Sequence, residues 1–386
     1  MKIAFVYDAV YPWVKGGAEK RIYELGTRLL EKGHEVHLFG IKWWEGPDVI
    51  EYEGMFLHGV CKARNLYVDG RRSISTAILF SLQLFPHLSY EKFDLIDVSV
   101  FPYFSCFTVK FVSILNKAHV VYTWHEVWDD YWYEYMGKAG FFGKVIEKAV
   151  SKISGDNIAV SGWTKQRLQK LGVPEGIISV VPNGIDLKEI SEIDSEADCK
   201  SHGIANKHYD VIFAGRLIKD KNVDVLLRAI YLLKVENPYI SCCIVGDGPE
   251  KAELMDLSNE IGVYKNVQFV GFQDYSSLIG KMKASRVFVL PSSREGFGMV
   301  VIEAFACSIP VVTVKEKYNA AQGLVEDGVD GFVVSLEDRE IAQAVWKIIE
   351  DDTTYKNMSK AAFQKSRDYD WDKALSILKN IYEARV

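Results

Sequence analysis

The chain has 386 residues, with 46 lysine and arginine against 52 aspartate and glutamate side chains, and a formal net charge of −6. Apolar residues make up 48% and charged residues 25%, which excludes a disordered chain, a collagen-like chain and a disulfide-stabilised miniprotein. The length predicts two or three domains. Because a dedicated nucleic-acid binder carries a basic excess, the mild acidity argues against a nucleic-acid partner.

The cysteines and the apolar stretches predict a cytoplasmic protein. Six scattered cysteines form no C-x-x-C pair and no zinc-like spacing, which favours reduced thiols. We expect no signal peptide, because Asp8 interrupts the apolar run that follows Lys2. We also expect no membrane span at 98–115, because Pro102 and Lys110 interrupt it. Peripheral contact with the inner face of the cell membrane stays open.

Short apolar runs alternate with helical patterns along the first half of the chain. A β-like run at 3–7 precedes apolar residues at helical spacing over 18–32, and Gly33 is a helix stop. Further strands are predicted at 35–40, 95–98, 120–124, 158–160 and 178–181. This alternation indicates right-handed βαβ units and a parallel sheet with helices on both faces.

The pattern restarts after a polar stretch at 186–209, where we expect a domain boundary. Strands are predicted at 210–214, 241–245, 267–271, 287–290 and 310–314, and helices at 222–234, 250–261, 276–284 and 299–307. The tail from 338 is predicted to be helical, with its last helix starting at Trp371. We therefore expect an α/β protein with two Rossmann-like doubly wound domains. Ligands of such sheets bind beyond the carboxyl ends of the strands.

The loop after the first strand ends in Gly16-Gly17 and leads into a helix. Paired glycines let the backbone approach a ligand closely, and the free N–H groups of a helix N-terminus attract an anion. The loop matches neither G-x-G-x-x-G nor a Walker pattern, so a dinucleotide or ATP site has no support. A tight turn without a ligand is the alternative interpretation.

A second loop, from Gly215 to Asn222, lies between a predicted strand and a predicted helix. Arg216 offers a planar fork of donors and Lys221 a point charge, and both suit a diphosphate. A solvated basic turn is the alternative interpretation.

The segment 291–304 carries the most specific pattern of the chain. Glu295, Gly296 and Gly298 lie in the loop before a predicted helix. Glu303 lies a little over one turn inside that helix. Carboxylates accept hydrogen bonds from hydroxyls, and sugars and ribose offer many hydroxyls. Glu303 lies in an otherwise apolar helix, where a carboxylate requires a partner. A sugar nucleotide is therefore favoured over a capped helix with incidental acids.

His125 follows the strand predicted at 120–124. It could contact a substrate or handle a proton, and a structural histidine is an equally good interpretation. Aromatic residues crowd the segment up to Tyr135. They could stack on an acceptor sugar, but a packed lid or a partner surface is the favoured interpretation.

Taken together, these stretches resemble the retaining nucleotide-sugar glycosyltransferases of family 4, which have the two-domain GT-B fold. The resemblance covers nearly the whole chain. It includes Gly16-Gly17-Ala18-Glu19, His125, Val180–Asp186, Gly215-Arg216 with Lys221, Val245–Pro249, Val270-Gly271-Phe272 and the Glu295-x7-Glu303 pair.

The resemblance implies an N-terminal acceptor domain at 1–187 and a C-terminal donor domain at 188–368, facing each other across a central cleft. A helix at 369–386 would cross back to the N-terminal domain. In two places the sequence departs from the usual pattern of the family. Ala320-Ala321-Gln322-Gly323 stands where paired glycines are usual, and Glu126 follows the histidine where aspartate is common.

The resemblance also implies roles for individual residues. The candidate catalytic residues are Arg216 and Lys221 on the donor diphosphate, Glu295 on the donor sugar, and His125 on the sugar from the N-terminal domain. The candidate substrate-binding residues are Gly16, Gly17, Asn183, Gly215, Gly271 and Phe272 near the base, Phe297, Gly298, Met299 and Val300 near the sugar, and Glu303 on the ribose.

The implied reaction moves a sugar from a UDP- or GDP-sugar to a hydroxyl acceptor, such as a lipid-linked glycan, a polysaccharide or a small sugar. The leaving diphosphate gains charge, which Arg216, Lys221 and two helix N-termini would stabilise. Because these cations would take the place of Mg²⁺, we expect no metal and no cofactor besides the nucleotide sugar. Retention by front-face attack is an expectation taken from the family. A sugar-nucleotide epimerase and a non-catalytic nucleotide-sugar-binding protein are the alternatives. The oligomeric state is not indicated.

Overall fold

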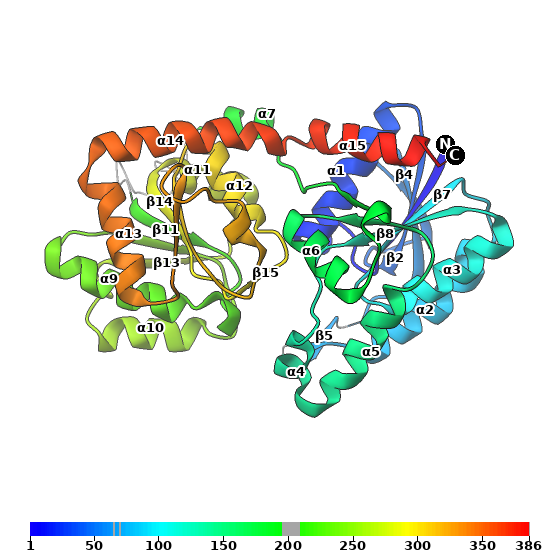
Figure 1. Cartoon of the computed structure of the whole chain (residues 1–386), viewed down its shortest axis with the longest axis horizontal. Coiled ribbons are helices and arrows are strands. Elements are labelled where there is room, and N and C mark those ends of the chain that lie inside the picture. The colour runs from blue at the N-terminus through cyan, green and yellow to red at the C-terminus, as the bar shows by residue number, and fades with distance from the viewer. Residues whose placement is uncertain (65, 69–70, 195–208, 386) are drawn as a thin grey trace. The chain divides into compact units, whose positions relative to one another are not determined.

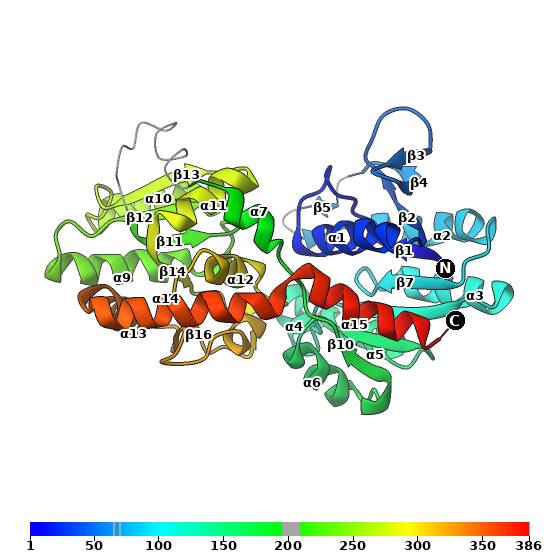
Figure 2. The ribbon, with the colours of Figure 1, turned by 90° about the horizontal axis from the view of Figure 1, so that it is seen from above.

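The computed structural model describes residues 1–64, 66–68, 71–194 and 209–385. The chain forms two compact units, Met1–Asn183 with Trp371–Val386, and Gly184–Asp370. Each unit contains its own parallel sheet flanked by helices (Figures 1 and 2). Most of the polar stretch expected to hold the domain boundary, with Cys199, lies outside the described residues. The boundaries at 187/188 and 368/369 stay predictions.

The N-terminal unit alternates strands and helices in chain order. Its elements are β1 (Lys2–Val6), α1 (Gly17–Glu31), β2 (Glu35–Lys42), β3 (Val49–Tyr52), β4 (Met55–Lys62), β5 (Tyr67–Val68), β6 (Arg71–Arg72), α2 (Ile74–Ser89), β7 (Leu95–Ser99), α3 (Phe104–Asn116), β8 (His119–Trp124), α4 (Tyr131–Met136), α5 (Gly140–Val150), β9 (Asp156–Ala159), α6 (Gly162–Leu171), β10 (Ile178–Val180) and the C-terminal α15 (Trp371–Glu383).

The sheet of this unit has the strand order β10-β9-β8-β7-β1-β2-β4-β3. Val6 of β1 pairs in parallel with Phe39 of β2 and with Val98 of β7. The chain passes from β1 to β2 on one side of β1 and later returns to β7 on the other side. The topological switch point therefore lies at the carboxyl ends of β1 and β7. The predicted doubly wound arrangement is confirmed.

An antiparallel edge hairpin, β3 with β4, was not predicted. Tyr52 pairs with Met55 across a two-residue turn in which Glu53 and Gly54 have φ angles of 49° and 84°. Two successive positive φ values are the signature of the tight turns that match the twist of a hairpin. A glutamate is an unusual first residue for such a turn, so the sequence signal was weak.

The C-terminal unit repeats the same architecture. Its elements are α7 (Leu187–Glu192), β11 (Tyr209–Ala214), η3 (Lys219–Lys221), α9 (Val223–Glu236), β12 (Cys242–Val245), α10 (Lys251–Glu260), β13 (Val267–Gly271), α11 (Tyr275–Lys283), β14 (Ser285–Leu290), β15 (Arg294–Glu295), α12 (Met299–Ala306), β16 (Val311–Val314), β17 (Tyr318–Asn319), η4 (Ala320–Gly323), β18 (Gly331–Val334), α13 (Asp338–Glu350) and α14 (Asp352–Ser366).

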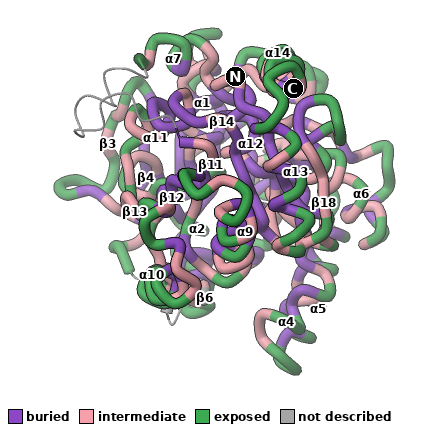
Figure 3. Tube along the Cα trace, turned by 90° about the vertical axis from the view of Figure 1, so that its left-hand side faces the viewer, coloured by how far each residue is buried: buried purple, intermediate pink, exposed green. Residues whose placement is uncertain are grey.

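The sheet of the C-terminal unit has the strand order β13-β12-β11-β14-β16-β18, and all its pairs are parallel. Its strands are short apolar runs, such as Val287–Leu290, that are buried on both faces. The strands β11 and β12 are buried along almost their whole length, whereas α10 is largely exposed (Figure 3). Continuous apolar strands are typical of sheets covered on both faces.

Helix α15 completes the N-terminal unit through buried polar contacts as well as apolar packing. Trp371 and Tyr382 are fully buried, and the Tyr382 hydroxyl donates to Asp97 Oδ2 of β7 at 2.5 Å. Thr123 Oγ1 of β8 donates to the other carboxylate oxygen of Asp97 at 2.7 Å. The buried carboxylate is thus satisfied by the last helix of the chain and by a central strand.

Two chemical expectations from the sequence can be compared with the described residues. Cys61, Cys106, Cys242, Cys243 and Cys307 are free thiols there. No helix in the described part of the chain is long and apolar enough to cross a membrane.

We predict that Tyr382→Phe destabilises the protein by about 1–3 kcal/mol, because it removes a donor from a buried carboxylate. Urea unfolding followed by circular dichroism measures this change. Tyr90→Phe is the matched control, since Tyr90 is 89% exposed, and its free energy of unfolding should stay within about 0.5 kcal/mol of the wild type. Equal stability of the two variants would contradict the role given to the Tyr382 hydroxyl.

Candidate functional site

The motif loops of the C-terminal unit lie at the switch point of its sheet. After β13 at one edge, the chain returns to β14 on the other side of β11. Loop 215–222 follows β11 and loop 291–298 follows β14, so both begin at the carboxyl ends of neighbouring strands. This position is where open α/β sheets bind their ligands.

The two loops are joined by ion pairs and backbone hydrogen bonds. The Lys221 ammonium pairs with Glu295 Oε1, and Arg294 Nε donates to Asp220 Oδ2 at 3.0 Å. The backbone N–H of Ser293 donates to the carbonyl of Asp220 at 2.9 Å. Lys221 and Glu295, singled out separately in the sequence, therefore form one unit. The Arg294–Asp220 pair beside them was not predicted.

Two glycines let the loop after β12 pack against loop 215–222. A Cβ on Gly246, whose φ is 137°, would lie 1.9 Å from the carbonyl oxygen of Gly215. A Cβ on Gly248 would lie 2.2 Å from the carbonyl oxygen of Leu217. The N–H of Gly246 donates to the Gly271 carbonyl at 2.9 Å, which brings the loop after β13 alongside. The loops after three neighbouring strands are thus packed backbone to backbone.

Within these loops the predicted residues differ in exposure. Arg216 is exposed, and Leu217 beside it is fully buried and anchors the loop. Gly271 has a φ of 73°, and Phe272 after it is 65% exposed. An exposed cation and an exposed aromatic ring thus lie at the ends of parallel strands of this sheet.

Helix α12 begins directly beside this cluster. Gly298 precedes it with a φ of 99°, and a Cβ there would lie 2.7 Å from Cβ of Ala321 in η4. Glycine is therefore required by both the backbone angle and the close packing. Glu303 is only 6% exposed on the apolar helix, Phe297 is buried, and Met299 and Val300 are partly exposed at the helix start. The segment that departs from the family pattern, Ala320–Gly323, forms the wall against Gly298.

In the N-terminal unit, Gly16 and His125 lie beyond the carboxyl ends of β1 and β8, as predicted. Gly16 is the N-cap of α1 and Gly17 its first residue. His125 Nε2 lies 3.2 Å from Ser99 Oγ at the end of β7. Burial, with a smaller contribution from the positive charge of Arg21, lowers the pKa of His125 to about 3. The imidazole is therefore neutral at physiological pH.

Asn183 is buried and takes part in the internal structure of this unit. Arg21 Nη1 donates to Asn183 Oδ1 at 3.0 Å and to the Pro182 carbonyl at 2.8 Å. Burial lowers the pKa of Arg21 to about 10, which leaves its guanidinium charged. This contact joins α1 to the segment that follows β10, and it was not predicted.

A buried carboxylate at the end of β1 was also missed as a site feature. Asp8 is 1% exposed and pairs with Arg72, while Trp43 Nε1 donates to the Asp8 carbonyl at 3.0 Å. Burial raises the pKa of Asp8, and Arg72 opposes this rise. The available signal was a charged residue directly after an apolar strand. Burial likewise raises the pKa of Glu19, on the first turn of α1, to about 7.

The aromatic segment after His125 packs within its own unit. Trp128, Tyr131 and Trp132 are buried, and the rings of Trp128 and Trp132 are 4.5 Å apart. The buried Glu147 of α5 accepts hydrogen bonds from the backbone N–H groups of Trp128 and Asp129, both at 2.7 Å. These contacts fit the favoured interpretation of a packed segment better than an open stacking platform.

One histidine and carboxylate cluster among the described residues has metal-ligand spacing, namely His37, His58 and Glu91. Its members already have partners. His37 Nδ1 lies 2.8 Å from His58 Nε2, His37 Nε2 lies 2.8 Å from Glu35, and Lys2 donates to Glu91 at 2.5 Å. The cluster is near the start of β2, at the end of the strands away from Gly16 and His125.

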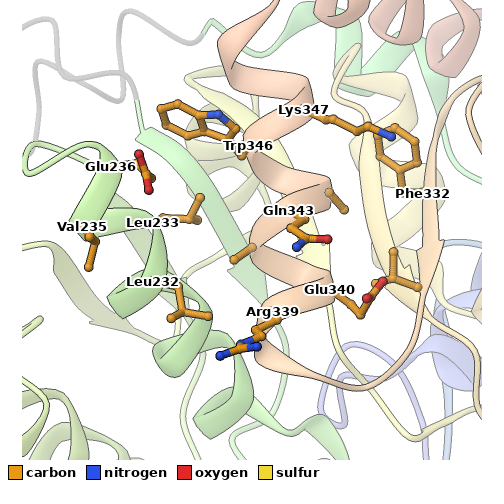
Figure 4. A pocket seen from close by; sticks show the side chains of 13 residues that line it. Leu232, Leu233, Val235, Glu236, Phe332, Arg339, Glu340, Gln343, Trp346 and Lys347 are labelled. Atoms are coloured by element: carbon orange, nitrogen blue, oxygen red, sulfur yellow. The ribbon is translucent and has the colours of Figure 1, made fainter.

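A pocket of about 750 Å³ lies elsewhere in the C-terminal unit, between α9, β18 and α13. Figure 4 shows Leu232 and Leu233 of α9 near α13, with Lys347 beside Phe332. The α9 residues are from its last turns, at the opposite end from loop 215–222. The motif residues therefore do not line this pocket.

Comparison with known proteins agrees with this architecture. The model of glycosyltransferase family 4 matches residues 15–189, and the model of the group 1 glycosyl transferases matches residues 194–365. An uncharacterised glycosyltransferase of Methanocaldococcus jannaschii is 25% identical, over 99% of this chain and 98% of its own.

Solved structures give the same fold. A sucrose-phosphate synthase from Thermosynechococcus elongatus superposes with a TM-score of 0.85 at 21% identity, covering 99% of this chain and 98% of its own. The Anabaena protein HepE superposes with a TM-score of 0.76 at 22% identity, covering 100% of this chain and 99% of its own.

The two sheets and the two matched models define an enzyme of the glycosyltransferase class with the GT-B fold. Within that class, the chain belongs to the family 4 glycosyltransferases. The match to two transferase family models favours a transferase over the epimerase and the non-catalytic alternatives.

We predict that Gly248→Ala destabilises the protein by about 1–3 kcal/mol, because its Cβ would overlap the Leu217 carbonyl. Gly323→Ala is the control, since no atom lies within 4 Å of a Cβ built there. Chemical denaturation measures both variants. Destabilisation by Gly323→Ala alone would contradict the packing of the two loops described above.

Proposed function

We propose that the protein transfers a sugar, with retained configuration, from a nucleoside-diphosphate sugar to a hydroxyl acceptor. The single observation that carries this proposal is the pairing of Lys221 with Glu295 at the switch point of the C-terminal sheet. A cation for a diphosphate and an acceptor for sugar hydroxyls are joined there at the edge where such sheets take their ligands.

The exposed Arg216 and the nearby Lys221 are proposed to bind the donor diphosphate. Arginine binds phosphate as a planar fork of donors, and lysine binds it as a point charge. Phosphate oxygens arriving beside Lys221 would share its ammonium with Glu295. The Glu295 carboxylate would then be able to accept a hydrogen bond from a hydroxyl of the donor sugar.

Helix α12 is proposed to hold the remainder of the donor. Its first N–H groups, after Gly298, suit a negatively charged or hydroxyl-rich group, because a helix N-terminus carries partial positive charge. Glu303, one turn further on, is proposed to accept from the ribose hydroxyls. The exposed ring of Phe272 after Gly271 offers a face for the base.

The donor is proposed to be a UDP- or GDP-sugar. A structure of Anabaena HepE was determined in complex with UDP and glucose, and another in complex with UDP-glucose. These neighbours support a uridine nucleotide as the first donor to test.

Catalysis is proposed to rest on charge stabilisation without a metal. As the glycosidic C–O bond breaks, negative charge grows on the leaving diphosphate, and fixed cations and backbone N–H groups stabilise it most where water is excluded. The leaving phosphate would take the proton of the attacking hydroxyl on the same face of the sugar. Glu295 would position the sugar through a hydrogen bond and would form no covalent bond to it.

The roles expected for the N-terminal unit stay predictions. Gly16 and Gly17 start α1 beyond the carboxyl end of β1, a position suited to an anion. His125, which is neutral, is proposed to contact the donor sugar as a hydrogen-bonding group. Asn183 is proposed to act through Arg21, because its side-chain oxygen already accepts from that guanidinium.

We predict that Arg216→Ala lowers turnover of UDP-glucose or GDP-mannose about 10²–10³-fold, because the leaving diphosphate loses a charged donor. Turnover is measured as release of the nucleoside diphosphate, with EDTA present throughout because no metal is expected. Arg228→Ala is the control, since Arg228 lies on α9 and pairs with Asp224. Full turnover by Arg216→Ala, or wild-type turnover that requires added Mg²⁺, would contradict the proposal.

Incubation of the donor without an acceptor gives a further arm of the same experiment. A transferase leaves the sugar nucleotide unchanged or hydrolyses it slowly. Conversion to an epimeric sugar nucleotide would instead identify an epimerase, whatever the effect of Arg216→Ala.

We predict that His125→Gln lowers kcat/KM by a factor that is constant between about pH 6 and 8. The reason is that the pKa of His125 is about 3, so the imidazole does not change charge in this range. His87→Gln is the control, because His87 is exposed on α2. A factor that varies with an apparent pKa near 6.5 would contradict a neutral His125.

A further inference from the structure

Three helices of the N-terminal unit expose large apolar side chains in regular stripes. On α2 and α3 the spacing is three or four residues, which places each set on one side of its helix. We call the whole set the apolar face. It consists of Ile74, Ile78, Leu82 and Phe85 on α2, Phe107, Phe111, Ile114 and Leu115 on α3, and Phe141, Phe142 and Val145 on α5.

Seven of these 11 side chains are more than half exposed. Leu82 is 69% exposed, Phe142 68% and Ile114 65%. Single exposed apolar residues are ordinary, but a set that spans neighbouring helices marks an interaction surface.

The stripes adjoin one another. Helices α2 and α3 pack together, with Ser81 Oγ 2.9 Å from Thr108 Oγ1, and the exposed rings of Phe85 and Phe111 have centroids 5.7 Å apart. Ile74 of α2 and Phe142 of α5 line one pocket of about 250 Å³. Figure 1 shows α3, α2 and α5 following one another along one side of this unit.

The charged side chains that these three helices expose are all lysines. Helix α2 contains no lysine, arginine or carboxylate, and α3 contains only Lys110. Helix α5 contains Lys144 and Lys148, and its one acid, Glu147, is fully buried and hydrogen-bonded. Lys144 forms ion pairs with Asp129 and Asp130, at 2.9 and 2.6 Å, so Lys110 and Lys148 carry the positive charge that accompanies the apolar face. The three helices expose no carboxylate of their own, although the chain as a whole carries a net charge of −6.

Apolar side chains with lysines beside them favour an anionic lipid surface over a second copy of the chain as the partner that covers the apolar face. If a second copy covered the face across a two-fold axis, the same patches would meet, and Lys110 and Lys148 would approach lysines of the other copy. The nearby acids Asp129 and Asp130 already form ion pairs with Lys144. An anionic lipid surface supplies both an apolar layer for the phenyl and leucyl groups and negative charge for the ammonium groups.

We propose that the apolar face of α2, α3 and α5 docks on the surface of an anionic lipid bilayer. The helices lie along the interface, with the exposed leucine, isoleucine and phenylalanine side chains at the boundary between headgroups and acyl chains. Lys110 and Lys148 lie at headgroup level, because long lysine side chains keep their ammonium groups in the polar layer.

The test is flotation of the full-length protein with vesicles, without donor or acceptor. One set of vesicles is phosphatidylcholine alone, and the other contains about 30% phosphatidylglycerol. We expect the wild type to float with the anionic vesicles and much less with the neutral ones. The triple variant Leu82→Gln/Phe111→Gln/Phe142→Gln removes one apolar side chain from each helix and should lower the partition coefficient at least about tenfold.

A matched triple variant controls for a general loss of surface hydrophobicity. Val235→Gln/Tyr239→Gln/Val329→Gln changes exposed side chains of the C-terminal unit and should float as the wild type does. Lys148→Glu should weaken binding to the anionic vesicles only. Far-UV circular dichroism and the thermal melting point check that each variant is folded.

Three results would overturn the proposal. The first is a wild type that floats with neither vesicle, and the second is an equal loss in both triple variants. The third is a wild type that is dimeric without lipid while the apolar-face variant is monomeric, which would assign the face to a second copy. Melting shifts with UDP-glucose are recorded on the same samples, so a failure of lipid binding is distinguishable from a failure of the donor proposal.

Discussion

The loops at the carboxyl ends of β11 and β14 are held together by oppositely charged side chains, and the candidate site depends on this contact. Lys221 and Glu295 pair across it, and Asp220 with Arg294 forms a second link beside the first. Buried or half-buried charges need partners, so each loop satisfies the other. A diphosphate would enter a site in which the cation is already positioned and the carboxylate can turn to a hydroxyl. The proposed charge stabilisation depends on cations that are fixed in place before the reaction begins.

A comparable constraint acts in the N-terminal unit, where buried polar groups tie distant segments together. Asp97 receives hydrogen bonds from Tyr382 of the last helix and from Thr123 of a central strand. Arg21 joins α1 to the segment at Asn183. A parallel sheet buried on both faces leaves few places for polar side chains, so those that remain determine which segments meet. The apolar face lies on helices α2, α3 and α5, whose inner sides already complete the core, and its exposed side is therefore available for another partner.

The sequence predicted most of the fold because its signals are local. Apolar runs followed by helix starts located 11 of the 14 strands described in the two sheets, and β3, β4 and β18 were not predicted. Gly33, with a φ of 81°, ended the first helix. The motifs at Arg216 and Glu295 could be assigned to loops for the same reason. The hairpin of β3 and β4 was missed because its turn has a glutamate where asparagine or aspartate is usual. The ion pair between the buried Asp8 and Arg72 was missed because 64 residues separate the two partners along the chain.

By itself, then, the sequence determined the alternation of strands and helices, the restart of that pattern and the family of the chain. All three follow from the spacing of residue types along the chain. Only the tertiary structure decided which charges meet, such as Lys221 with Glu295, which are 74 residues apart. It also decided which side of α2 and α3 stays exposed. Both helices are apolar on more than one side, so periodicity alone does not distinguish the side that packs on the sheet. Packing distinguishes the two sides, because only one of them can face the strands.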